Sequence, residues 1–212
     1  MIGKRVRYAT CATAIAGALA AGATPALASE AERIGDDLFV TDVPNNEFND
    51  VRVFYESSRQ EVNIVDAQGI TAGFGCMNVT ATRVSCSDSP VLGRINVLLG
   101  DNPDQFLAEG GQFALPLGLS LNVSGEGGSD TITGSRSGDT LNGGSGNDLI
   151  RGKGGNDVLG GSSDVGRDRF IAGAGSDKIR AQDGQRDADI DCGAGDDRRA
   201  QTDSVDPQPR SC

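Results

Sequence analysis

The chain has 212 residues, with 31 Gly and no His, and its 19 basic and 30 acidic side chains give a net charge of −11. The lack of His excludes H-E-x-x-H zinc sites, Ser-His-Asp triads and Cys-His pairs, and with them most familiar hydrolase mechanisms. So acidic a chain also argues against nucleic acid or an anionic membrane surface as a partner. Cations are its natural counterpart.

Residues 1–28 have the pattern of a secretory signal peptide. Lys4, Arg5 and Arg7 precede an apolar, Ala-rich stretch that ends in Ala26-Leu27-Ala28. We therefore expect cleavage after Ala28 and a secreted, extracellular protein. Insertion into a membrane is disfavoured, because the stretch is rich in Ala and Gly and no second apolar segment of about 20 residues follows it.

Four cysteines remain once Cys11 leaves with this segment: Cys76, Cys86, Cys192 and Cys212. An even number in an exported chain favours disulfides over free thiols. Pairing of Cys76 with Cys86 and of Cys192 with Cys212 is the most local of three possible connectivities.

Residues 29–90 are predicted to form a short N-terminal β region. Residues 51–55 and 62–65 are rich in β-branched and aromatic side chains and are bounded by Asn, Asp, Ser and Gly, which is typical of strands. Residues 79–84, between two cysteines, predict a turn or hairpin. Nothing in this region carries recognisable chemistry.

Residues 91–200 form a second region, whose strongest part, 125–179, holds 16 of the 31 glycines. A flexible linker, a disordered tail or a repeat would each explain this composition. The spacing favours a repeat, because aspartates recur every nine residues and an apolar residue follows two positions after each. After a two-residue insertion around 161–166 the pattern resumes, giving six units: Asp130/Ile132, Asp139/Leu141, Asp148/Ile150, Asp157/Leu159, Asp168/Phe170 and Asp177/Ile179.

The best unit, residues 143–151, reads G-G-S-G-N-D-L-I-R and matches the nonapeptide G-G-x-G-x-D-x-U-x at every specified position. The segment thereby resembles the repeats-in-toxin (RTX) calcium-binding repeat. Residues 125–130, 152–157 and 172–177 fit with one substitution or displaced glycine, whereas 134–139 keeps only two glycines and the aspartate. The resemblance implies an all-β fold, a right-handed parallel β-roll (β-solenoid) with two nonapeptides per coil, and Ca²⁺ as the bound ion.

The chemistry of the unit agrees with that resemblance. Glycine allows positive φ and a backbone curled with its carbonyls inward, and Ca²⁺ takes six to eight oxygens from carbonyls and carboxylates. With two nonapeptides per coil, alternate aspartates share an edge, so we expect ions bridging Asp130 with Asp148, Asp148 with Asp168, Asp139 with Asp157, and Asp157 with Asp177. The insertion leaves open whether the two pairs that span it form. The predicted metal-site residues are Asp130, Asp139, Asp148, Asp157, Asp168, Asp177, Gly143, Gly144, Gly146, Gly152, Gly154 and Gly155.

Both ends of the array predict caps. Residues 95–106 resemble a decayed repeat, with Asp104 and Phe106 in the usual relation, and 115–123 predict a further strand. Downstream, Arg199 takes the apolar position, so stacking is expected to stop there, with 201–212 as a C-terminal cap. Residues 187–191 begin like an EF-hand loop, but position six is Cys192 and position twelve is Arg198, which favours an irregular repeat with Ile190 inward.

These observations predict a secreted, non-catalytic calcium-binding protein, with no catalytic residues and no cofactor other than Ca²⁺. A cell-surface or matrix partner is compatible with this prediction. The alternatives are a polysaccharide-active enzyme that works with paired acids, or an adhesin, carrying the repeat as an accessory module. Only about 60 residues precede the array, too few for a separate catalytic domain of usual size.

Overall fold

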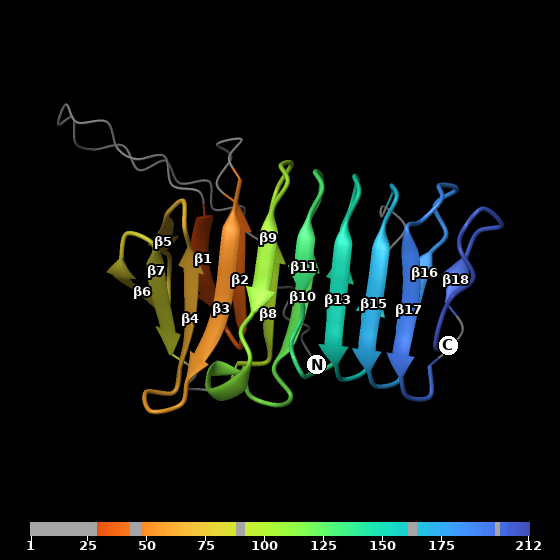
Figure 1. The fold of residues 1–212 in the computed structure, drawn as a ribbon. Coiled ribbons are helices and arrows are strands. Elements are labelled where there is room, and N and C mark those ends of the chain that lie inside the picture. Colours follow the sequence, from red (N-terminus) through yellow and green to blue (C-terminus); the bar gives the residue numbers. More distant parts are fainter. Residues whose placement is uncertain (1–28, 43–47, 88–91, 161–164, 198–199) are drawn as a thin grey trace, which may run out of the picture.

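The computed structural model describes residues 29–42, 48–87, 92–160, 165–197 and 200–212. The expected signal peptide, most of the insertion and Arg199 lie outside this part. The described chain is all-β, with two nine-stranded sheets that lie against each other as two layers (Figure 1). A single 3₁₀ turn, η1 (Gly111–Phe113), is the helical element among the described residues.

Sheet A follows the order β18-β16-β14-β12-β10-β8-β2-β1-β5. Its strands are β1 (Ser29–Ile34), β2 (Asp37–Asp42), β5 (Ile70–Ala72), β8 (Arg94–Leu98), β10 (Ser120–Ser124), β12 (Thr140–Asn142), β14 (Val158–Leu159), β16 (Lys178–Ala181) and β18 (Gln201–Thr202).

Sheet B follows the order β17-β15-β13-β11-β9-β3-β4-β7-β6. Its strands are β3 (Asp50–Glu56), β4 (Glu61–Asp66), β6 (Cys76–Thr80), β7 (Arg83–Ser87), β9 (Gln105–Ala108), β11 (Thr131–Thr133), β13 (Leu149–Gly154), β15 (Arg169–Ala174) and β17 (Asp189–Ala194).

From β8 onward the chain alternates between the sheets, and from β10 onward every strand pairs in parallel with the one two places earlier. One strand of each sheet therefore makes one coil. The apolar residue of each unit points between the sheets: Ile132 pairs with Ile150 and Ile150 with Phe170, and all three side chains are buried. Since one face of each strand is covered, this stacking fixes the register.

The insertion does not disturb the register. Leu149 pairs with Arg169 in sheet B and Leu159 pairs with Ile179 in sheet A, on either side of the inserted residues. β14 ends at Leu159 and β15 begins at Arg169, and both sheets continue past the insertion.

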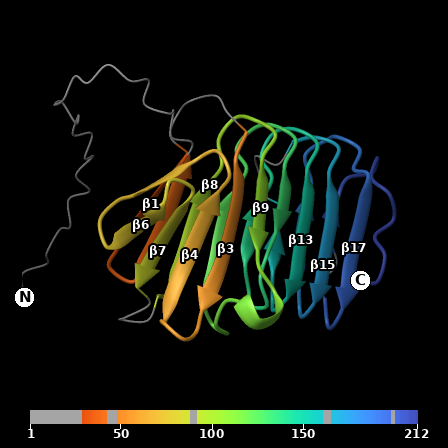
Figure 2. The same cartoon turned by 60° about the vertical axis from the view of Figure 1, so that its left-hand side comes forward.

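The N-terminal strands pair antiparallel, except for β1 with β5, and they extend the same two sheets (Figure 2). β2 pairs in parallel with β8, and β3 with β9, so one hydrophobic core runs from this region into the repeats. The strands predicted at 51–55 and 62–65 are confirmed as β3 and β4, and the hairpin at 79–84 as β6–β7.

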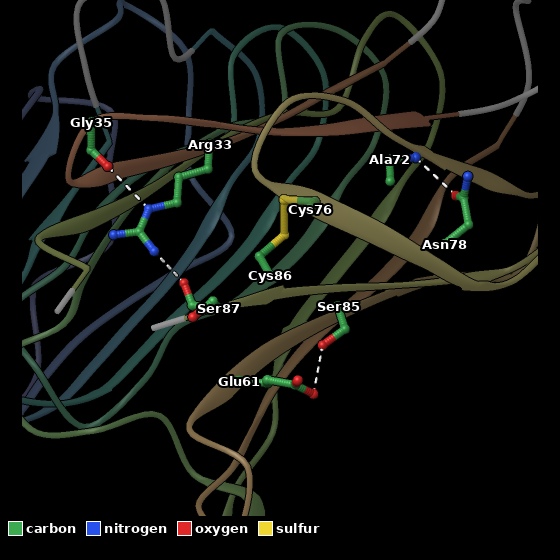
Figure 3. Close-up of a disulfide and its surroundings, with 9 residues drawn as sticks. All are labelled: Arg33, Gly35, Glu61, Ala72, Cys76, Asn78, Ser85, Cys86 and Ser87. Atoms are coloured by element: carbon green, nitrogen blue, oxygen red, sulfur yellow. Dashed lines mark hydrogen bonds between the residues drawn. A yellow bond between two sulfur atoms is a disulfide. The ribbon is translucent and has the colours of Figure 1, made fainter. Parts of the chain in front are cut away.

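Both local disulfides are present. Cys76–Cys86 joins directly opposed residues of β6 and β7, close to Arg33 (Figure 3). The Arg33 guanidinium donates to the carbonyls of Gly35 and Ser87, so its charge is held by backbone oxygens near the end of the core. Cys192–Cys212 ties the C-terminal tail to β17.

The ends of the repeat array differ in part from the predicted caps. The strand expected at 115–123 is shorter and later, Ser120–Ser124, because η1 and a turn at Pro116 precede it. The EF-hand alternative is wrong, since Asp189 and Asp191 lie in β17 and Ile190 is buried. Stacking also continues past position 199: β18 pairs with β16, and Ala200 packs against the core.

Candidate metal centre

The aspartates of the repeat lie in the loops that join the two sheets, and these loops form two rims. The first rim consists of the loops that lead from sheet A into β9, β11, β13, β15 and β17, at the upper ends of these strands in Figure 1. The second rim consists of the loops that return from these strands to sheet A, at their lower ends. Most of these loops supply an aspartate shortly before the next strand, although the loop between β9 and β10 has none.

On the first rim the aspartates form a ladder, in which each backbone N–H donates to the Oδ1 of the aspartate one coil later. Asp130 N lies 2.8 Å from Asp148 Oδ1, and Asp148 N lies 2.8 Å from Asp168 Oδ1. The ladder extends beyond the predicted members at both ends, to Asp104, Asp187 and Asp206.

The second rim carries the same ladder. Asp139 N donates to Asp157 Oδ1, and Asp157 N to Asp177 Oδ1, each over 2.8 Å; Asp177 N continues to Asp197 Oδ1. The structure therefore brings together all four predicted pairs, including the two that span the insertion.

These carboxyl groups are buried, which changes their acidity. Burial raises the pKa of Asp130, Asp157 and Asp168 to about 7, and the neighbouring aspartates of the ladder add to the rise. Burial likewise raises the pKa of Asp148 and Asp177. Two rows of buried like charges therefore oppose folding at neutral pH, unless a cation compensates them.

The second oxygen of most ladder carboxylates lacks a hydrogen-bond donor. The buried Oδ2 atoms concerned are those of Asp130, Asp148, Asp157, Asp177, Asp187 and Asp197. Burying a carboxylate oxygen without a donor costs free energy, so such an oxygen needs a hydrogen-bond donor or a cation. Because these atoms recur along both rims, the group that satisfies them must recur as well.

Backbone carbonyls face the same oxygens. A Cβ on Gly125 would lie 2.1 Å from Asp130 Oδ2 and 2.2 Å from the Gly143 carbonyl oxygen of the next coil. A Cβ on Gly152 would meet Asp157 Oδ2 and the Ala172 carbonyl oxygen in the same way, at 2.2 and 2.4 Å. Oxygens of two coils thus converge on each glycine, and this donor set is the kind that Ca²⁺ prefers.

The other predicted glycines shape the loops. Gly144, Gly146 and Gly155 have φ of +100°, +137° and +104°, and their Cα atoms lie against carbonyl or backbone atoms of the preceding coil. Gly143 lies against Asp148 Oδ2, as Gly152 does against Asp157 Oδ2. Gly154 differs, because it lies within β13 and a Cβ there would make an ordinary 3.6 Å contact.

No group of three or more Asp, Glu or Cys residues gathers closely enough to hold a metal ion anywhere in the described part of the chain. Carboxylates therefore come one or two at a time, and backbone carbonyls must provide the remaining ligands. A ligand set of one or two carboxylates with several backbone carbonyls suits Ca²⁺, whose coordination is flexible and readily uses carbonyls.

The predicted metal-site residues omit four members of the ladders: Asp104, Asp187, Asp197 and Asp206. The signal was present, since Asp187 follows Asp168 by 19 residues and Asp197 follows Asp177 by 20, close to the 20-residue coils created by the insertion. A search for a strict nine-residue period does not find these longer coils.

Two sheets of alternating parallel strands, with glycine- and aspartate-rich loops on both rims, define a class of repeat proteins. The family model of the RTX calcium-binding nonapeptide repeat matches residues 124–159 and 162–185 in four copies. The match confirms the predicted resemblance for these residues, and the repeat implies calcium binding.

Searches of the curated proteins and of the solved structures gave no significant match. Among the described residues, no helix is long and apolar enough to cross a membrane.

Proposed function

We propose that this is an exported, non-catalytic scaffold protein that binds Ca²⁺ between successive coils of a right-handed parallel β-roll. The observation that carries the proposal is the recurrence of buried Oδ2 atoms without donors, in most coils and on both rims. A calcium ion supplies the positive charge that these oxygens lack.

In this proposal carboxylates and backbone carbonyls of adjacent coils supply the calcium ligands. Asp130, Asp148 and Asp168 supply carboxylates on the first rim, and Asp157 and Asp177 on the second. The loop glycines let carbonyls of adjacent coils approach these carboxylates, as the contacts at Gly125 and Gly152 illustrate. The inward apolar residues hold the coils at the spacing that aligns the loops.

Export is supported by the N-terminal segment, residues 1–28, and by two disulfides, which persist in oxidising compartments. In this proposal residues 29–90 cap one end of the roll of 91–200, and residues 201–212 cap the other. The antiparallel strands β4, β6 and β7 support the first cap, since they end the parallel stack.

Binding to a cell-surface or matrix protein is a second candidate function. It is favoured by Phe74, Met77 and Val79, which lie on or beside the edge strand β6 and are 80%, 65% and 49% exposed. Exposed apolar side chains on an unpaired strand edge are typical of a protein contact. Met77→Lys should then abolish retention on the producing cells without changing calcium binding.

A calcium titration of the purified protein tests the main proposal, with Mg²⁺ as the control ion and far-UV circular dichroism and calorimetry as readouts. We expect a cooperative gain of β signal with Ca²⁺ that is lost in Asp148→Ala plus Asp157→Ala. The matched control is Glu30→Ala plus Asp36→Ala, which removes two exposed acids far from the rims. Absence of calcium binding at millimolar concentration, or an equal response of both variants, would refute the proposal.

A further inference from the structure

One loop of the second rim, residues 134–139, differs in backbone conformation from its neighbours. In five loops the second and fourth residues both have positive φ: 125–130, 143–148, 152–157, 172–177 and 192–197. In 134–139 these places are held by Ser135 and Ser137, and neither has a positive φ. This loop therefore does not curl its carbonyls as the other five do.

The carboxylate of this loop also has different partners. Asp139 Oδ2 accepts the Ser135 backbone N–H at 2.7 Å and the Ser135 hydroxyl at 2.9 Å, while Oδ1 accepts the Leu121 N–H at 2.9 Å. Both oxygens of Asp139 are thus hydrogen-bonded, whereas Asp157 Oδ2, on the same rim, is buried without a donor. The carboxylate oxygen that lacks a donor at Asp157 is therefore satisfied at Asp139 by its own loop.

A positive charge is already present beside this loop. Lys153 lies in the next loop of the second rim, at a φ of +78° where the following coils have Gly173 and Gly193. Its Nζ reaches back over the coil of 134–139 and donates to the Ala108 carbonyl at 2.6 Å. Desolvation lowers the pKa of this ammonium, while the nearby carboxylates of Glu109 and Asp139 act to raise it.

We propose that loop 134–139 is a calcium-free position of the second rim, where the Lys153 ammonium takes the part that calcium plays elsewhere. Calcium binding on this rim then begins at Asp157 and uses the loops 152–157 and 172–177. The inference rests on the proposed calcium binding of the other loops. In this proposal the Lys153 ammonium takes the place of the calcium ion that was expected to bridge Asp139 and Asp157.

Lys153 and Ser135 act together in this arrangement. Ser135 replaces the second glycine of its unit and supplies both donors to Asp139 Oδ2, and Lys153 replaces the second glycine of the next unit and supplies the charge. A calcium ion placed there would have to displace the serine hydrogen bonds and meet the repulsion of the ammonium and of Arg136.

Calorimetric stoichiometry of single variants tests the proposal. Asp157→Asn should lose one ion relative to the unaltered protein, whereas Asp139→Asn should bind the same number of ions. Loss of one ion in both variants would overturn the proposal. In the converse variant, Ser135→Gly, Ser137→Gly and Lys153→Gly together restore the repeat pattern and should gain one ion; an unchanged number would also overturn it.

A stability measurement at saturating calcium separates this proposal from the proposed function, because it does not count bound ions. Under these conditions Lys153→Met should lower the thermal midpoint, because Asp139 and Glu109 lose their cation, while Arg180→Met, an exposed cation on β16, should not. Equal midpoints of the two variants would contradict the role of Lys153. If the unaltered protein bound no calcium, only the proposed function would fail.

Discussion

At the scale of single residues, glycine matters in this protein where one coil touches the next. A Cβ on Gly146 would lie 1.3 Å from the carbonyl oxygen of Gly128, at a φ of +137° that side chains rarely adopt. By contrast, a Cβ on Gly110 would meet no atom within 4 Å and needs no unusual φ. The two glycines therefore have different physical roles, although the sequence presents both as loop residues.

Gly146→Ala should lower the free energy of unfolding in calcium by more than about 2 kcal/mol, because the coils must separate and the backbone is strained. Gly110→Ala, the matched control, should change it by less than about 0.5 kcal/mol. Denaturant unfolding at saturating calcium measures both. An equal effect of the two substitutions would show that the close approach of Gly146 to the Gly128 carbonyl does not determine the free energy of unfolding.

The nonapeptide pattern predicted the residues that face inward and those that form the ladders, because both follow from a local period. It did not predict which loops depart from the pattern. The substitutions Ser135 and Lys153 are visible in the sequence, but only the fold places Lys153 beside Ala108, 45 residues away. Contacts across two coils are not encoded in a nine-residue window.

At the scale of strands, each coil of the repeat contributes one large buried side chain per strand. Ile150 of β13 is fully buried between Ile132 and Phe170 of the adjacent strands, whereas Leu149 points outward and is half-buried. So small a core per strand makes each inward residue important for stacking.

Ile150→Ala should cost about 2 to 5 kcal/mol of stability in calcium, since a cavity opens between two coils. Leu149→Ala, on the opposite face of the same strand, should cost clearly less. Thermal or denaturant unfolding of the two variants provides the comparison. A larger effect at Leu149 would mean that the outer face of sheet B is covered in solution.

The insertion illustrates what the sequence could and could not predict about the elements. The resumed spacing at Asp168 predicted that the repeat continues, and the register of β13 with β15 confirms it. The pairing of β2 with β8 and of β3 with β9 was not predictable, because it joins strands more than 50 residues apart that share no local pattern. The N-terminal strands looked like a separate region for this reason.

At the scale of the whole molecule, the two ends of the stack differ in what holds them together. The N-terminal strands contribute several buried aliphatic side chains each, for example Val62 and Ile64 of β4, and carry a disulfide. The repeat strands contribute fewer apolar side chains, and most of their loops bury an aspartate. Ordering so glycine-rich a segment costs more than its apolar burial returns, so we expect its folding to depend on the proposed calcium binding.

Hydrogen exchange in EDTA should therefore retain protection in β3, β4 and β7 and lose it in β13, β15 and β17. Addition of calcium should restore protection in the latter strands, because a ligand that binds the folded form stabilises it. Uniform loss of protection along the chain would show that the N-terminal strands depend on calcium as well. Uniform retention would show that the repeats do not.

Acid should partly replace calcium in stabilising the fold. In the calcium-free chain, burial raises the pKa of Asp130, Asp157 and Asp168 from 3.8 to about 7, so the folded form binds protons more tightly than the unfolded form. Stability from these groups is then fully present below about pH 4 and is lost as the pH rises through about 7.

Melting curves at pH 5 and pH 8 test the direction of this pH dependence of stability. In EDTA the thermal midpoint should be higher at pH 5, because the buried carboxyls are then largely neutral. With saturating calcium the order should reverse, since the ion requires the carboxylates and protons compete with it. A calcium-free midpoint that rises from pH 5 to pH 8 would mean that the rims relax and expose their aspartates to water when the ion is absent.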